Sequence, residues 1–174
     1  MIKKTVLALV LLLVIAGGAF FLMNSSDNYD ASKYSASVDK LVEGEAIDFT
    51  LPDQFGKAHT LSADTKTLVL TFAKATSHLV RDFLKSQPAD YLSSRNAFYV
   101  ADISPMPVVI RNAFAMPDLK KSAYPVILIY DPKIAAKFRD DSQKDAIMIV
   151  SLDHKKVTSV KFAEDVDTLK ALLK

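Results

Sequence analysis

Three side chains with hydrogen-bonding or nucleophilic atoms, Thr76, Ser77 and His78, follow soon after the apolar run 67–73. This run, TLVLTFA, is short and rich in β-formers, which predicts a strand buried on both faces. Thr76 or Ser77 then offers an N-cap for a helix through about Gln87. The free N–H groups and positive dipole end of that helix would hold an anion or a peptide carboxylate, with Ser77 donating and His78 assisting. The same residues also fit a plain N-cap beside a solvated histidine.

A nucleophilic Ser77–His78 pair is a further interpretation of this segment. Adjacent residues in the first turn of a helix point apart, and the sequence offers no identifiable carboxylate to orient the histidine. A cysteine-independent enzyme that uses Thr76, Ser77 and His78 stays open as an alternative.

Methionines beside prolines raise the question of a metal. Met106 and Met116 each precede a proline, and thioethers with an imidazole such as His78 would suit Cu(I). Methionine also fills irregular gaps beside prolines, so packing is the better explanation for these two residues. His59 and His154 fall in predicted turns without a second ligand at metal spacing, so we expect them at the surface. We assign no metal site and expect no cofactor, while a copper carrier remains an alternative.

The sequence contains no cysteine. Dithiol exchange needs thiolates that attack and leave, and a hydroxyl whose pKa lies far above neutrality can do neither. The chain is therefore not a thiol–disulfide oxidoreductase or a thiol peroxidase. Its formal net charge is +2, from 22 basic and 20 acidic side chains with no basic run, a pattern that does not favour nucleic-acid binding.

The first residues have the pattern of an export signal. Lys3 and Lys4 precede an unbroken apolar run over 6–23, whose length lies between that of a cleavable signal and that of a membrane-spanning helix. We expect residues 1–23 to be an uncleaved signal anchor, with cleavage of a signal peptide after Gly18 as the alternative. The positive-inside rule keeps the lysines in the cytoplasm. This predicts a single-pass protein of the bacterial inner membrane with its domain in the periplasm, or else an exported soluble periplasmic protein.

The remaining chain divides into a polar linker over 24–40, rich in Ser, Asp and Asn, and one domain over 41–174. Within the domain the pattern predicts a hairpin, a strand, a helix, a strand, an irregular helical stretch, a strand, a second hairpin and a C-terminal helix. Strands that alternate with helices and then close with a hairpin indicate an α/β fold with a mixed sheet flanked by helices.

This order resembles the thioredoxin-like fold, in particular membrane-tethered reductases and peroxiredoxin relatives of the bacterial periplasm. The resemblance rests on an F-x-L-x-D-x-x-G opening, on the strand TLVLTFAKA running into a helix, and on Tyr124-Pro125 before the apolar run 126–131. Where the family carries Cys-x-x-Cys, this sequence has Thr76-Ser77-His78-Leu79. The sequence KATS at 74–77 is also similar to YtfJ-type periplasmic proteins. The residues of the F-x-L-x-D-x-x-G opening are Phe49, Leu51, Asp53 and Gly56.

The resemblance implies that Tyr124-Pro125 is a cis peptide bond beside the start of the helix at Thr76, preceding a strand antiparallel to 67–73. In the family the backbone next to this proline pairs with extended substrates. The leading hypothesis is thus a non-redox periplasmic binding or accessory module, tethered to the inner membrane, that contacts a protein or peptide partner in the cell envelope. Its candidate binding residues are Thr76, Ser77, His78, Tyr124 and Pro125. An envelope assembly component that interacts through its N-terminal helix is a third hypothesis.

Overall fold

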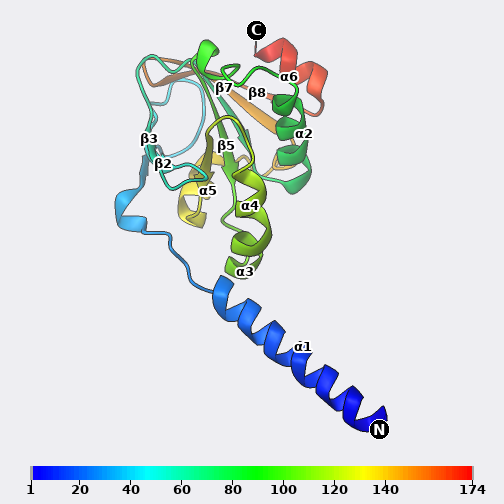
Figure 1. Ribbon diagram of the computed structural model, residues 1–174. Helices are drawn as coiled ribbons and strands as arrows, with labels where there is room; N and C mark the ends of the chain where they lie inside the picture. The colour runs from blue at the N-terminus through cyan, green and yellow to red at the C-terminus, as the bar shows by residue number, and fades with distance from the viewer. Residues whose placement is uncertain (1, 174) are drawn as a thin grey trace.

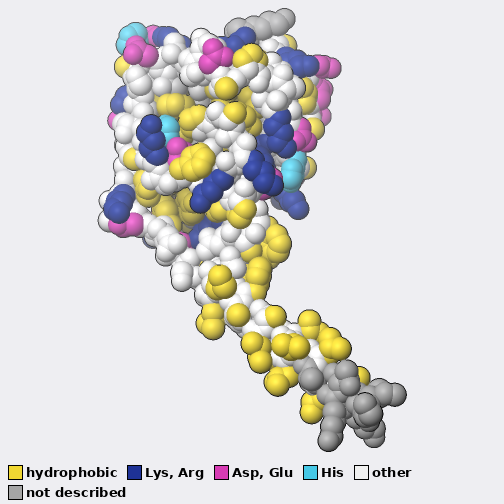
Figure 2. Space-filling model, viewed as in Figure 1, with side chains coloured by type: hydrophobic (Ala, Val, Ile, Leu, Met, Phe, Trp, Pro, Cys, Tyr) yellow, Lys and Arg dark blue, Asp and Glu magenta, His cyan; other side chains and the backbone are white. Residues whose placement is uncertain are grey.

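The computed structural model describes residues 2–173. A long N-terminal helix, α1 (Ile2–Asn24), projects from a domain in which helices and strands alternate (Figure 1). The apolar side chains along α1 are largely exposed, as Figure 2 shows. Within the described residues, no helix combines the length and the apolar character needed to cross a bilayer. The separate membrane helix expected from the sequence is therefore not found.

A five-stranded mixed sheet forms the centre of the domain, in the order β6-β5-β4-β7-β8. The strands β4, β5 and β6 run parallel, and β7 and β8 run antiparallel to their neighbours. The apolar runs in the sequence form the buried strands, as strands covered on both faces require. The five strands are β4 (Thr67–Thr71), β5 (Ala97–Asp102), β6 (Val126–Ile129), β7 (Ile147–Asp153) and β8 (Lys156–Ala163).

Helices cover one face of this sheet. The side chains of α2 and α6 pack on it around Tyr99, Phe83 and Leu169, and the helical segment after β5 contributes Leu119 to the same cluster. That segment is α3 (Val108–Ile110), the π-helix η3 (Arg111–Ala115) and α4 (Met116–Leu119). The other helices on this face are α2 (Lys74–Lys85) and α6 (Val166–Leu172), and the short 3-10 helix η2 (Ser93–Arg95) precedes β5.

A second, three-stranded antiparallel sheet and the helix α5 (Pro132–Phe138) cover the opposite face. The aromatic rings of Phe49 and Phe138 meet there, with centroids 6.1 Å apart. The predicted first hairpin is confirmed as β2 (Asp48–Pro52) and β3 (Ala58–Thr60). The third strand, β1 (Ser35–Ser37), pairs with β2 and follows the 3-10 helix η1 (Ala31–Lys33). The second half of the segment predicted as a linker is thus ordered against the domain.

The predicted neighbour of β4 is wrong. The strand β6 pairs in parallel with β5, whereas β7 takes the antiparallel place beside β4. The chain reaches β6 through the helical segment after β5, and such a crossover joins parallel strands. Tyr124-Pro125 does precede β6 as expected, but β6 is not the neighbour of β4. The strand that is, β7, follows Ala146 and not a proline.

Candidate functional site

The helix α2 begins earlier than the sequence predicted. Its N-cap is Ala73, which makes no side-chain capping bond. Thr76 lies inside the first turn, and its Oγ1 donates to the carbonyl oxygen of Ala73 at 3.0 Å. Because Thr76 is buried and its hydroxyl is used in this way, it neither caps the helix nor faces a ligand.

Ser77 belongs to a cluster of hydroxyl groups at the end of β4. Its Oγ lies 2.8 Å from Oγ1 of Thr71, which in turn lies 3.1 Å from the hydroxyl of Tyr99. Burial raises the pKa of Tyr99, so this hydroxyl stays protonated. The Ser77 hydroxyl pairs with Thr71, and among the described residues no base bonds it that would activate it as a nucleophile.

A hollow of about 580 Å³ opens beside Ser77 at the carboxyl ends of β4 and β5. We call it the apolar hollow, because most of its walls are apolar side chains. His78 lines it and is exposed to solvent. The apolar wall consists of Phe72, Tyr99, Ala101, Ile103, Pro105, Met106, Pro107, Ile110, Phe114, Ala115 and Leu119.

Asp102 places a buried carboxyl group in the wall of the apolar hollow. Its Oδ1 accepts a hydrogen bond from the Ser104 N–H at 2.9 Å, whereas its Oδ2 is buried without a hydrogen-bond partner among the described residues. Burial raises the pKa of Asp102, an effect that outweighs the bonds from Ser104. An incompletely bonded buried carboxyl group in a wall is what a site for a polar ligand atom would present.

Arg81 adds a buried cation to the same wall. Its guanidinium lies 2.7 Å from Oδ2 of Asp118, and its Nε has no partner among the described residues. The hydrogen bond from Arg81 lowers the pKa of Asp118. The walls therefore hold fixed groups of both signs around an apolar interior, an arrangement that can orient a ligand held by apolar contact.

Comparisons with known proteins show the fold. No family model and no curated protein matches the sequence. Among solved structures, a protein of Neisseria meningitidis classed as a candidate thioredoxin superimposes with a TM-score of 0.50 at 16% identity, over 75% of this chain and 87% of that one. The peroxidoxin BcpB of Mycobacterium tuberculosis gives a TM-score of 0.49 at 22% identity, over 75% and 95% of the two chains. The fold is thioredoxin-like.

The apolar hollow lies where the thioredoxin-like resemblance led us to expect chemistry, at the junction of β4 and α2. The chain contains no cysteine, so it is a redox-inactive form of the thioredoxin-like fold. The similarity to YtfJ-type proteins finds no support in these comparisons.

Tyr124 and Pro125 do not belong to the apolar hollow. No peptide bond among the described residues is cis, so the expected cis proline is wrong. Val126 is in register with Tyr99, whereas the end of β4 is in register with Ala101. Pro125 thus lies about three residues, or ~10 Å, back along the sheet from the end of β4. It lines a separate hollow with Asn96 and other residues near the start of β5.

The side chain of Gln54 explains how the Tyr124-Pro125 turn is held without a cis bond. It lies in the turn between β2 and β3 and is buried. Its amide bonds the backbone on both sides of Pro125, at Tyr124 and Val126. This turn is therefore a structural feature of the fold, and the expected peptide-binding role for its backbone has lost its geometric basis.

The side chains considered as metal ligands lie apart from one another. His59 lies in β3, where its Nε2 is 2.9 Å from Oδ2 of Asp53 and only 14% of its side chain is exposed, so its expected surface position is wrong. Met106 lines the apolar hollow, but Met116 lines a different one and accepts from the Tyr130 hydroxyl at 3.6 Å. The described His, Asp and Glu side chains form no metal-binding group of three.

Asp102 and Arg81, the buried charged residues among those that line the apolar hollow, were missed from the sequence. Asp102 ends the buried strand β5, and an acidic residue at the carboxyl end of a buried strand is a signal that could have identified it. Arg81 follows the helical spacing of an exposed face, and nothing in the sequence indicates that Asp118, 37 residues away, holds it inside.

Proposed function

We propose that this chain is a non-redox binding module that takes an apolar side chain of a protein or peptide partner in the apolar hollow. The observation that carries the proposal is the hollow itself, about 580 Å³ in volume and open beside α2. This volume lies within the range of about 300–1,000 Å³ that ligand sites have. It accommodates one large side chain with its flanking backbone.

The rim of the hollow supports a partner of this kind. Ile110 and Phe114 line the hollow, yet 48% and 60% of their surfaces are exposed. Exposed apolar side chains beside a concave site are typical of interaction surfaces. An aromatic or aliphatic anchor of a partner would enter the hollow, and its neighbouring backbone would lie against this rim.

Polar groups would fix the orientation of such an anchor. Asp102 and Arg81 line the hollow, and Oδ2 of Asp102 and Nε of Arg81 have no hydrogen-bond partner in the part of the chain that the structure describes. A backbone N–H or carbonyl group of a bound segment would satisfy them, which improves on their bonding in the free protein. Of the candidate residues predicted from the sequence, Ser77 and His78 belong to this proposal, and Thr76, Tyr124 and Pro125 do not.

The binding test uses peptides selected on the protein itself. A displayed library of short random peptides is panned against the immobilised chain, and the retained peptides are titrated against variants. Ala115→Phe places a ring in the hollow and is expected to weaken binding about tenfold or more. Leu79→Phe is the matched control, since Leu79 is an exposed residue of α2 outside the lining. Equal affinity for both variants, or no selected peptide, would count against the proposal.

We further infer that the domain acts after export. Support comes from Lys3 and Lys4 ahead of the apolar run 6–23, which is the pattern of export signals. Fractionation with N-terminal sequencing tests this: a mature chain in the periplasm beginning near Ala19 is the expected product of cleavage. An unprocessed chain recovered entirely from the cytoplasm would contradict the inference.

A further inference from the structure

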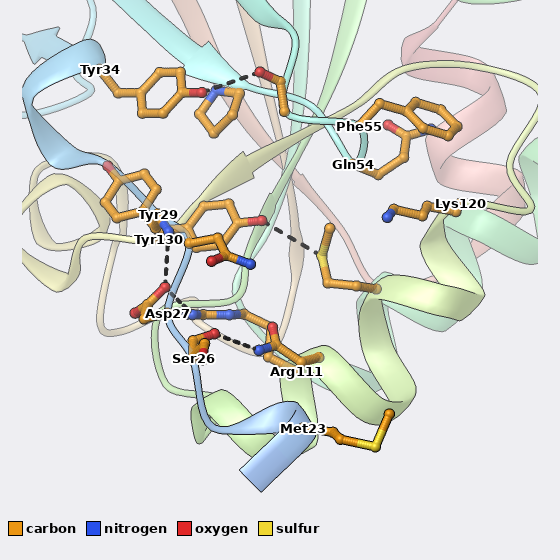
Figure 3. Close-up of a pocket in the computed structure, with 15 residues that line it drawn as sticks. Met23, Ser26, Asp27, Tyr29, Tyr34, Gln54, Phe55, Arg111, Lys120 and Tyr130 are labelled. Carbon is orange, nitrogen blue, oxygen red and sulfur yellow. Dashed lines mark hydrogen bonds and ion pairs between the residues drawn. The ribbon is translucent and has the colours of Figure 1, made fainter.

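The polar segment 24–34, between α1 and β1, is docked on the domain by specific contacts (Figure 3). We call this segment the tether and the surface beneath it the tether groove. The Nδ2 of Asn112 donates to the carbonyl oxygens of Asn24 and Ser26, at 3.0 and 2.9 Å. Because both acceptors are backbone carbonyl oxygens, these bonds fix the direction of the tether whatever its side chains at these two positions. The tether groove is lined by Gln54, Phe55, Arg111, Asn112, Met116, Lys120 and Tyr130.

An aromatic slot holds one side chain of the tether. The ring of Tyr29 stacks on that of Tyr130, with centroids 4.6 Å apart and planes 6° from parallel. Its neighbour along the tether, Tyr34, stacks beside it at 5.5 Å and donates its hydroxyl proton to the Gly56 carbonyl at 3.2 Å. Stacking of this kind requires a flat ring at position 29.

A buried arginine holds a second side chain of the tether. Arg111 is 5% exposed, and its guanidinium lies 2.6 Å from Oδ1 of Asp27 and 4.8 Å from the centre of the Tyr130 ring. The Nε of Arg111 is buried without a partner among the described residues. A buried guanidinium with an unused donor selects for an acidic side chain, because no neutral group repays its desolvation equally well.

The tether does not fill the groove. A hollow of about 460 Å³ remains beside it, reaching Phe55 and Lys120 (Figure 3). Phe55 is 64% exposed. A segment that used the Asp27 and Tyr29 positions and also covered Phe55 and Lys120 would make contacts that the tether lacks.

We propose that the tether groove is a peptide-binding site that recognises an acidic residue followed two positions later by an aromatic residue. Asp27 and Tyr29 occupy it in cis. The partner is an extended protein segment with the same spacing and with further apolar or acidic residues that reach Phe55 and Lys120. This proposal concerns a different surface from the apolar hollow and stands independently of the function proposed for it.

Competition by the tether determines how the test is designed. A short flexible connection gives a tethered ligand an effective concentration of about millimolar, so a free peptide of equal affinity barely displaces it. The protein for the test is therefore the full chain with Asp27→Ala and Tyr29→Ala, which removes the two tether side chains and keeps their partners Arg111 and Tyr130. The probe is a fluorescent peptide with the sequence of residues 24–34, and its control carries Asp→Asn and Tyr→Ala at the same two positions.

The native-sequence peptide is expected to bind the doubly substituted chain at least about tenfold more tightly than the control peptide. Its binding to the wild-type chain should be weaker by a similar factor, because the wild-type tether occupies the groove. The two recognised residues are changed in the peptide and not in the groove. The comparison therefore needs no substitution of the buried Arg111, which could disturb folding. Equal binding of the two peptides, equal binding to the two proteins, or no binding to the doubly substituted chain would each overturn the proposal.

Discussion

Gln54 donates a hydrogen bond from Nε2 to the carbonyl oxygen of Tyr124 over 2.9 Å, and its Oε1 accepts from the N–H of Val126 over 2.8 Å. One buried amide thus fixes the turn around Pro125. We predict that Gln54→Ala lowers the free energy of unfolding by about 2–4 kcal/mol, since it leaves two buried backbone groups unpaired. Pro125→Ala should change it by less than about 1 kcal/mol, because Pro125 is exposed and trans. Urea denaturation measures both, and a larger effect for Pro125→Ala would refute the assignment.

The hydroxyl cluster beside the apolar hollow gives a second prediction. The Tyr99 hydroxyl contacts Thr71 inside the core, so Tyr99→Phe should destabilise the domain by about 1 kcal/mol. Tyr91→Phe is the control, because the ring of Tyr91 packs on Phe83 while its hydroxyl makes no bond among the described residues. Its effect should stay within about 0.5 kcal/mol. Indistinguishable unfolding midpoints for the two variants would show that the cluster contributes nothing.

A third prediction concerns pH. Burial raises the pKa of Asp102 in the folded state, so the folded chain binds this proton more tightly than the unfolded chain. Stability contributed by this group is therefore lost as pH rises from its unfolded pKa, about 3.9, through its higher folded pKa. Asp102→Asn removes this loss and keeps the acceptor for Ser104. The stability of the variant relative to wild type should rise with pH across that window and then level off. A relative stability that falls with pH would contradict the raised pKa.

Redox inactivity is the fourth prediction. The purified chain should not catalyse insulin reduction by dithiothreitol or thiol-dependent peroxide reduction above the uncatalysed rate, since it has no cysteine. A chain in which Thr76 and Leu79 are replaced by cysteine is an informative comparison for the assay. Turnover by the wild-type chain that persists after repurification would contradict this prediction, because the chain would then catalyse the reaction without a thiol.

The sequence was informative where side-chain pattern alone decides the structure. The apolar runs at β4 and β5, the turn at Asp53–Gly56 and the absence of cysteine predicted the fold and excluded thiol chemistry. The expected pairing of β6 with β4 came from the resemblance. The side-chain pattern could not correct it, since a strand buried on both faces has the same pattern beside any neighbour. The position of Arg81 was also not predictable, because its burial depends on Asp118 from another helix.

The most direct test of the binding function is a methyl-resolved NMR titration of the full chain with a peptide selected on it. The largest shift changes are expected on the methyl groups of Ile103, Met106, Ile110 and Leu119, which line the apolar hollow. The methyl groups of Val157, packed in the core on the opposite face of the sheet, should be unaffected. Changes confined to the face around Val157, or to α1, would contradict the claim that the apolar hollow is the binding site.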